Sequence, residues 1–228
     1  EALLLNAIAD VGSSSSIDTY DELTNLASIV NRLSIIAAGG IASPALTAQD
    51  LEALGITGVT SANLSAVIAA IAATANDGSG IDSMAELQTV ANTGVANART
   101  ASQGIIAAYT GSNTAPTLAD YQNAEVSGVT SSNIAAINSF IAQLSTTASD
   151  SQAEVQAVVD AYVLVVAAAN GLADGGASLG AADYAALGLE IINTAAEVSL
   201  MNDVLDAKSV NGVDTYTELA AIATAVSG

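Results

Sequence analysis

The chain has 228 residues, of which 51% are hydrophobic but only 3% aromatic, so Ala, Val, Ile and Leu must fill its core. Small aliphatic side chains of this kind favour closely packed helices. Three basic residues (Arg32, Arg99 and Lys208) against 23 acidic ones give a net charge of −20. This balance excludes a nucleic-acid binder, because three scattered cations cannot replace the counterions of phosphates.

Four segments with the same helix-start signal occur along the chain. Each has a Thr or Ser followed three residues later by a Glu, the pattern of a capping box. The segments are Asp18–Leu23, Asp82–Leu87, Asp150–Val155 and Asp214–Leu219, and their starts are 64, 68 and 64 residues apart. The predicted caps are Thr19, Ser83, Ser151 and Thr215, paired with Glu22, Glu86, Glu154 and Glu218. Apolar residues at helical spacing follow each signal, so each predicts the start of a long helix.

A second signal predicts a middle helix in each copy. It reads GVTSANL at Gly58–Leu64 and GVTSSNI at Gly128–Ile134, with Thr60 and Thr130 as the predicted caps. The last copy departs from this pattern at Leu189–Thr194, but Val198, Met201 and Leu205 keep a degenerate apolar face.

A third signal, an acidic residue followed by a bulky one, predicts a short helix. It occurs at Asp50-Leu51, Asp120-Tyr121 and Asp183-Tyr184, after Thr47 in the first copy and Thr117 in the second. We expect Gly55 and Gly128 to end the first two of these helices, since glycine is the preferred residue after a helix.

Together these signals predict an all-α protein made of tandem three-helix units of about 65 residues in a linear array. The predicted segments are 1–44, a partial repeat holding helices two and three; 45–115 and 116–177, two complete repeats; and 178–228, a repeat truncated in its third helix. Within 45–115, Gly94 and Gly104 predict a weakened third helix that resumes at Gln103–Tyr109.

The amino-acid sequence of Leu46–Val90 and Thr117–Leu144 resembles the helical repeats of very large bacterial surface proteins, which are adhesin-like or part of biofilm matrices. It also resembles three-helix albumin-binding modules distantly. The resemblance covers essentially the whole chain. It implies secretion or surface display on a bacterium and a structural or adhesive role, and it supplies no catalytic residue to transfer.

Catalytic and cofactor chemistry is not expected from this composition. The chain has no His and no Cys, so the usual triads and zinc sites are excluded. The acids stand mostly at helix starts and in loops, where capping accounts for them. Membrane insertion is not expected either, because the uncharged stretches Ala53–Asn76 and Val126–Ser149 are interrupted by Gly, Ser, Thr and Asn.

Calcium is the one metal that the sequence raises. The loop Asn76–Asp82 places Asp77 and Asp82 around two glycines, which superficially resembles a calcium loop. It lacks the alternating acids and the bidentate Glu of an EF-hand. We therefore favour a Gly-rich turn leading into a helix cap and keep a weak calcium site at Asp77 and Asp82 as the alternative.

Two further groups have a functional and a structural interpretation. Asn63 and Asn133 would serve either as partner-binding groups or, as we favour, as partners of helix-end or neighbouring polar groups. The tyrosines beside caps would either form exposed contacts or, as we favour, close the ends of helix bundles. These are Tyr20, Tyr121, Tyr184 and Tyr216.

The leading hypothesis is a non-enzymatic structural region, a stalk or spacer whose units contact their neighbours, or a subunit that self-assembles into a fibre, layer or matrix. Its location would be extracellular or at the bacterial cell surface, as the resemblance implies. The alternative is a binding module that recognises a host protein or glycan through helix faces.

Overall fold

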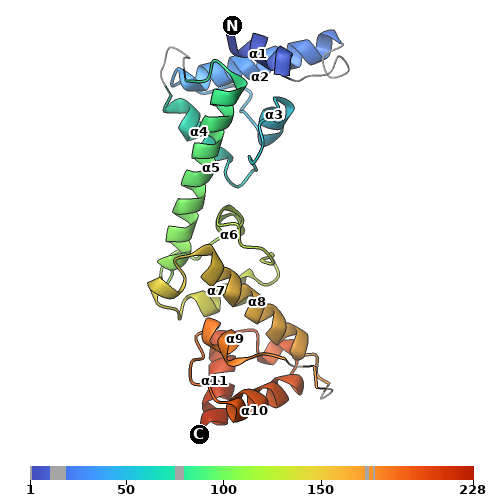
Figure 1. The fold of residues 1–228 in the computed structure, drawn as a ribbon, viewed down its shortest axis with the longest axis vertical. Helices are drawn as coiled ribbons and strands as arrows, with labels where there is room; N and C mark the ends of the chain where they lie inside the picture. The colour runs from blue at the N-terminus through green and yellow to red at the C-terminus, as the bar shows by residue number, and fades with distance from the viewer. Residues whose placement is uncertain (1, 11–18, 75–79, 173–174, 177) are drawn as a thin grey trace. The chain divides into compact units, whose positions relative to one another are not determined.

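The computed structural model describes residues 2–10, 19–74, 80–172, 175–176 and 178–228. Across these ranges the secondary structure is helical, and the one β-type interaction is an isolated bridge between Asn170 and Ser209. The all-α prediction is therefore confirmed (Figure 1). The helices are α1 Ala2–Asp10, α2 Tyr20–Ala37, α3 Ala48–Ala53, α4 Leu64–Ala72, α5 Met84–Ala107, α6 Leu118–Asn123, α7 Ile134–Ile141, α8 Gln152–Ala168, α9 Ala181–Ala186, α10 Ala195–Asp206 and α11 Tyr216–Ser227, with short 3-10 helices η1 Thr146–Ala148 and η2 Val210–Gly212.

Helix lengths follow the order that the sequence signals predict. A six-residue helix stands before two longer helices three times: α3 before α4 and α5, α6 before α7 and α8, and α9 before α10 and α11.

The chain divides into two compact units, Glu1–Thr100 and Ala101–Gly228. The division falls inside α5, since Leu87 and Ala91 belong to the core of the first unit and Ile106 to the core of the second. The compact units therefore group the helices differently from the sequence repeats. The segment boundaries that the repeats predict remain a prediction.

In the first unit, α2 is the central helix, because α1, α3 and α4 all contact it. Its buried residues, with those of α3 and α4, form one aliphatic cluster that includes Ile29, Leu33, Leu51 and Ile71. Burial of such side chains is the main contribution to the stability of a small helical unit.

The predicted weakening of the helix at Gly94 is wrong, because α5 runs unbroken from Met84 to Ala107. A Cβ atom at Gly94 would lie 2.5 Å from the Cα atom of Val67. The missing side chain therefore lets the backbones of α4 and α5 approach closely, and packing outweighs the low helix propensity of glycine.

In the second unit, α8 contacts α7, α9 and α10, and α11 contacts both α7 and α10. Phe140 of α7 is fully buried, with ring centroids 5.8 Å from Tyr162 of α8 and 6.2 Å from Tyr216 of α11. The Phe140–Tyr216 pair is edge-to-face, a geometry that adds to the stabilisation from burial.

All four capping boxes of the long helices are confirmed. The Ser83 hydroxyl accepts from the Glu86 amide at 3.3 Å, and Glu86 accepts from the Ser83 amide at 3.1 Å. Thr19, Ser151 and Thr215 make the same reciprocal bonds at the starts of α2, α8 and α11.

The prediction that Thr60 and Thr130 cap the middle helices is wrong. Helix α4 begins at Leu64 and α7 at Ile134, each after a turn. The Asn63 side chain closes that turn, accepting from the Thr60 amide at 2.8 Å and donating to the Gly58 carbonyl at 3.0 Å. Asn133 makes the equivalent bonds to Thr130 and Gly128, so both asparagines hold their own loops. The last copy uses a conventional cap instead, with Thr194 and Glu197 at the start of α10.

The prediction that Gly128 ends the second short helix is also wrong. Gly55 follows α3 with φ +81° and Gly188 follows α9 with φ +76°, as expected for glycine after a helix. After α6 the equivalent position is Glu125, which adopts φ 60°. A non-glycine residue in this region carries a cost of about 1 kcal/mol.

Candidate functional site

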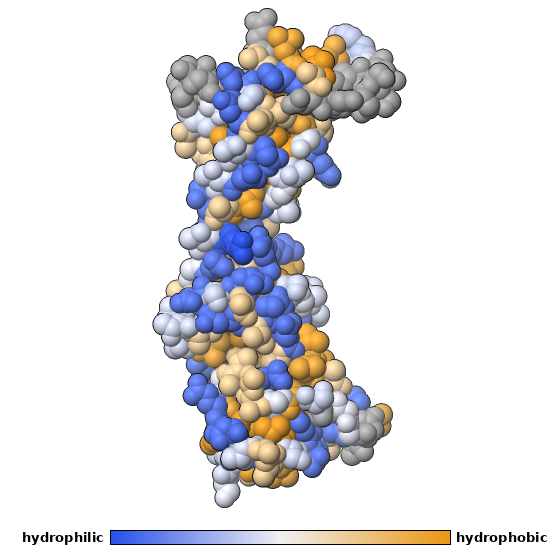
Figure 2. All heavy atoms as spheres, viewed as in Figure 1, coloured by the Kyte–Doolittle hydropathy of each residue, from blue (hydrophilic) through white to orange (hydrophobic). Residues whose placement is uncertain are grey.

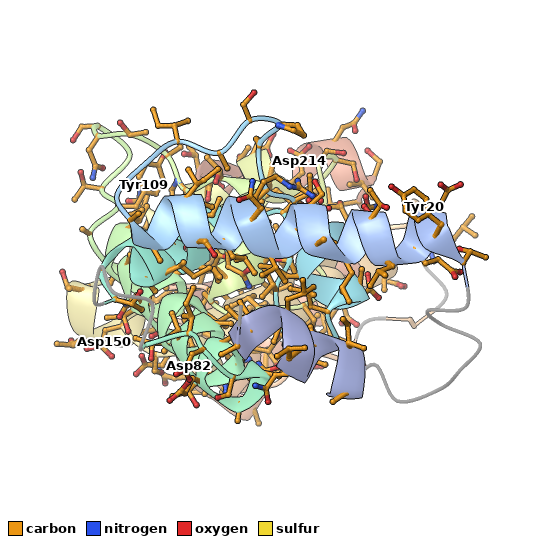
Figure 3. All side chains as sticks on the ribbon, turned by 90° about the horizontal axis from the view of Figure 1, so that it is seen from above. Tyr20, Asp82, Tyr109, Asp150 and Asp214 are labelled. Atoms are coloured by element: carbon orange, nitrogen blue, oxygen red, sulfur yellow. The ribbon has the colours of Figure 1, made fainter. Side chains whose placement is uncertain are left out.

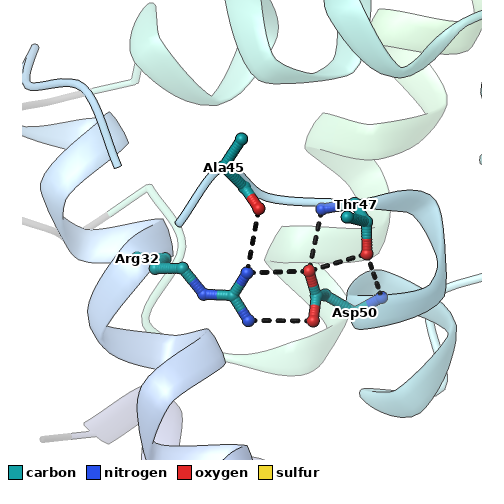
Figure 4. Close-up of polar contacts among 4 residues, drawn as sticks. All are labelled: Arg32, Ala45, Thr47 and Asp50. Carbon is teal, nitrogen blue, oxygen red and sulfur yellow. Dashed lines mark hydrogen bonds and ion pairs between the residues drawn. The ribbon is translucent and has the colours of Figure 1, made fainter. Parts of the chain in front are cut away.

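The candidate site is the junction between a long helix and the short helix that follows it, where polar side chains are buried. In the first unit, Arg32 of α2 reaches Asp50 of α3 with both terminal nitrogens, Nη1 to Oδ2 and Nη2 to Oδ1, each at 2.8 Å. Nη1 also donates to the Ala45 carbonyl at 3.1 Å (Figure 4). The side chains are only 8% and 17% exposed. Such a bidentate pair fixes the orientation of the guanidinium group in addition to neutralising its charge.

Asp50 has two roles at this junction, because it also caps its own helix. Its Oδ2 atom accepts from the Thr47 amide at 2.8 Å and from the Thr47 hydroxyl at 2.7 Å. Burial is the largest single influence and raises the pKa of Asp50, but the bonds from Arg32 and Thr47 together outweigh it. The net pKa lies below its ordinary value, so the carboxylate is charged at neutral pH.

In the second unit, the same arrangement recurs without the arginine. Asp120 of α6 accepts from the Thr117 amide at 2.7 Å and the Thr117 hydroxyl at 2.6 Å. At the place of Arg32 stands the buried Ser102 of α5, whose hydroxyl donates to Asp120 Oδ1 at 3.2 Å. A groove of about 450 Å³, lined mainly by apolar atoms, adjoins Asp120, and Ser102 does not line it. Its walls include Ala101, Gly104, Ile105, Ala108, Ala115 and Asp120.

A third version of the junction is apolar. Here Val165 of α8 occupies the place of Arg32 and Ser102 and is fully buried. Asp183 still accepts from the backbone amide at the start of its helix, that of Gly180, at 2.7 Å. The capping role of the acid is therefore kept in all three versions, and its partner on the long helix varies.

A buried tyrosine–asparagine pair joins the short and middle helices of the second unit. Tyr121 donates to Asn138 Oδ1 at 2.6 Å, and Asn138 donates to the Pro116 carbonyl at 3.0 Å. Tyr184 and Asn202 repeat both bonds, the second to Leu179. Burial raises the pKa of both phenols, so they stay protonated donors. These two tyrosines are buried as the bundle-closing interpretation expects, whereas Tyr20 is 81% exposed.

Glutamine side chains connect the long helix to the loop before the middle helix. Gln88 accepts from the Thr57 amide at 2.9 Å and donates to the Thr57 carbonyl at 3.2 Å. Gln156 makes the same two bonds with Ser127, at 2.9 Å and 3.3 Å. The equal chemistry at equal places indicates that these contacts maintain the helix packing.

Of the two predicted calcium ligands, Asp77 lies outside the described residues. Asp82 is exposed just before α5 (Figure 3). Its pKa is raised by a hydrogen bond with Glu86, the capping residue of that helix. Among the residues that the structure describes, no three acidic side chains gather in a way that would hold a metal ion.

The surface shows apolar side chains interspersed with polar ones (Figure 2). Among the described residues, the most exposed large hydrophobic side chain is that of Ile41, at 95%, in the loop between α2 and α3. None of the helices within the described ranges has the length and apolarity to span a membrane.

A scan against protein-family models, a search of curated proteins and a search of solved structures each returned no match. The candidate site is therefore defined by contacts that recur within the chain. The sequence pattern marks Asp50 and Asp120 only as parts of short-helix starts, and it gives no sign of their partners Arg32 and Ser102 when each copy is read alone. A signal appears when the copies are compared, because each partner stands 18 residues before the acid that it contacts.

Proposed function

We propose that the chain is a non-enzymatic structural region, a stalk or spacer of helical repeats in a secreted or surface-displayed bacterial protein. The observation that carries the proposal is the recurrence of one set of contacts at matching places. The helix caps, the tyrosine–asparagine pairs and the glutamine bonds all recur. The tyrosine–asparagine pairs join two helices, and the glutamine bonds join a long helix to a loop. Their function is to hold neighbouring elements in register.

The long helices suit this role because each contributes to more than one group of contacts. Helix α2 contacts α1, α3 and α4, and α8 contacts α7, α9 and α10. A helix that packs against elements on both sides of it in the sequence couples successive copies, which is the basis of stability in repeat proteins. The proposed location at the cell surface rests on the resemblance of the repeat sequence to the repeats of bacterial surface proteins.

Light scattering coupled to small-angle X-ray scattering, with and without calcium, tests this proposal. We expect an elongated monomer whose dimensions do not change when calcium is added. Large assemblies would favour the variant in which copies associate into a fibre or layer. A compact particle with a cleft would contradict the stalk and favour a binding module for a protein or glycan.

A further inference from the structure

We propose that a pocket between the α9–α10 loop and α11 binds the side-chain amide of a glutamine from a neutral or basic partner polypeptide. The inference goes beyond the structural role, because it assigns a ligand to one place in the second unit. It starts from Gln88 and Gln156, which make the same two bonds to the loop before a middle helix. In the last copy this glutamine is absent.

The missing glutamine is located by counting from the helix caps. Gln88 and Gln156 each stand five residues after the cap of their long helix. Five residues after Thr215, the cap of α11, stands Ala220. Because an alanine side chain ends at its Cβ atom, α11 has no amide at this position with which to bind the loop.

The loop side of the arrangement is kept. In each copy a buried aliphatic residue follows the short helix and donates its amide to a carbonyl of that helix. These residues are Ile56, Val126 and Leu189, with bonds of 3.0, 2.9 and 2.8 Å. The next residue is the one whose backbone the glutamine binds in the first two copies, and in the last copy it is Glu190. The chain therefore enters the loop in the same way in all three copies.

The backbone of Glu190 has the groups that a primary amide needs. Its N–H donates to no acceptor among the residues that the structure describes. Its carbonyl accepts from the Asn193 side chain at 3.1 Å, which uses one of the two lone pairs of that oxygen. A primary amide presents an acceptor and a donor side by side, whereas a carboxylate lacks the donor and a guanidinium lacks the acceptor. The chemistry therefore selects a carboxamide.

A pocket of about 260 Å³ lies where the glutamine is missing. Its walls include Glu190, Ile191, Ala220, Ala223 and Thr224. Because Ala220 and Glu190 both line it, the pocket lies between the position of the absent side chain and the residue that this side chain would bind. The aliphatic side chains of Ile191 and Ala223 provide the apolar surface on which the methylene stem of a glutamine would pack.

Thr224 offers a further acceptor at the pocket wall. It stands four residues after Ala220, and at the corresponding positions Asn92 and Asp160 accept from the glutamine amides at 2.8 and 2.9 Å. The Thr224 hydroxyl donates to the Ala220 carbonyl at 2.8 Å, so its lone pairs are left to accept a bond. The groups that surround the amide of Gln88 thus have counterparts around the pocket.

Charge restricts the polypeptides that can enter. The chain carries −20, and Glu190 places a carboxylate at the pocket wall. An acidic partner, including a second copy of this chain, is therefore repelled at long range. A glutamine in a neutral or basic segment meets no such barrier.

The test titrates the isotope-labelled chain with N-acetyl-glutamine N-methylamide, which carries one primary amide, and follows amide shifts by NMR. The control is N-acetyl-norleucine N-methylamide, which has a stem of similar length without the amide. We expect saturable shifts at Glu190, Ile191 and residues 220–224 with the glutamine compound. The norleucine compound should bind at least about tenfold more weakly, because it makes no hydrogen bond to Glu190.

Two matched variants make the test specific. Ala220→Gln supplies the amide internally, as Gln88 does in the first unit. It should abolish binding and slow the hydrogen exchange of the Glu190 amide. Gln88→Ala frees the Thr57 backbone and should add a second set of shifts near Thr57.

Three results would overturn the proposal: no saturable shifts around Glu190, equal binding of the norleucine compound, or unchanged binding in Ala220→Gln. Shifts of the same residues that grow with protein concentration, without any added compound, would identify a second copy as the occupant. That outcome would reject the neutral or basic partner.

Discussion

Single residues at matching positions perform different tasks in this chain. The place 18 residues before each short-helix acid holds Arg32, Ser102 or Val165, and gives a buried ion pair, a neutral hydrogen bond or an apolar contact. The second residue after each short helix is glycine twice and Glu125 once.

The tyrosine–asparagine pair provides the first prediction. The first unit has Leu51 and Ile68 where the second has Tyr121 and Asn138, an apolar pair in place of a polar one. Tyr121→Phe leaves the buried Asn138 oxygen without its donor and should cost about 1 to 3 kcal/mol.

The matched control is the double variant Tyr121→Leu with Asn138→Ile, which copies the first unit. Since both polar partners are removed together, we expect it to be more stable than the sum of the two single variants. Urea unfolding followed by circular dichroism measures this. Simple additivity would show that the two side chains do not interact.

The Arg32–Asp50 pair provides a prediction of pH dependence. The pKa of Asp50 is lowered in the folded chain, so its charged form stabilises the fold at pH values above its ordinary pKa of 3.8. That contribution decreases as the pH falls below 3.8 toward the lowered value. Arg32→Met should therefore cost about 2 kcal/mol at pH 7, and the difference from the unchanged chain should shrink in acid.

Urea titrations at several pH values between 7 and 2.5 measure this difference. Urea is uncharged and does not screen the ion pair, unlike a guanidinium salt. A difference that stays constant across the range would contradict a role for the Asp50 charge.

At the scale of the helices, local signals determine where a long helix starts, and packing determines how far it extends. The capping boxes start the long helices independently of their surroundings, and Thr19, Ser83, Ser151 and Thr215 all use the same bonds. Packing decides how far such a helix continues, as α5 shows by passing through Gly94 and Gly104 without a break.

These two glycines give a matched pair of variants in one helix. Gly94→Ala places a methyl group 2.5 Å from the Val67 Cα atom, so α4 and α5 must separate. We expect a net loss of about 1 to 3 kcal/mol, although alanine favours the helix.

Gly104→Ala is the control, because its added Cβ atom meets nothing within 4 Å. It should stabilise the helix by up to about 1 kcal/mol. Thermal unfolding measures the stability of both variants. Equal changes in stability in the same direction would show that close packing at Gly94 has no energetic importance.

At the scale of the whole chain, the two compact units have separate cores. Ile71 of α4 and Ile141 of α7 stand at matching places 70 residues apart, and both are fully buried. Their substitution therefore perturbs one core at a time.

Ile71→Ala and Ile141→Ala should each cost about 2 to 5 kcal/mol in their own core. Hydrogen exchange measured by mass spectrometry should show faster exchange in α2 and α4 for Ile71→Ala, and in α7, α8 and α11 for Ile141→Ala. Equal acceleration throughout the chain in either variant would indicate one cooperative block instead of two.

The sequence by itself determined the helical class, the order of the helices and the starts of the long ones. These features depend on local chemistry: a cap residue, its glutamate three positions later and the spacing of apolar residues act within a few residues of one another. The two predicted caps that failed, Thr60 and Thr130, instead donate their own backbone amides to the side chains of Asn63 and Asn133. Short-range patterns do not reveal which of several polar side chains takes a given bond.

Only the tertiary structure decided the rest. The division inside α5, the close approach at Gly94 and the partner of each short-helix acid all depend on which surfaces meet across 18 or more residues. Burial gives such contacts their energy, and burial is a property of the packed helices, whereas the helix signals are properties of the chain.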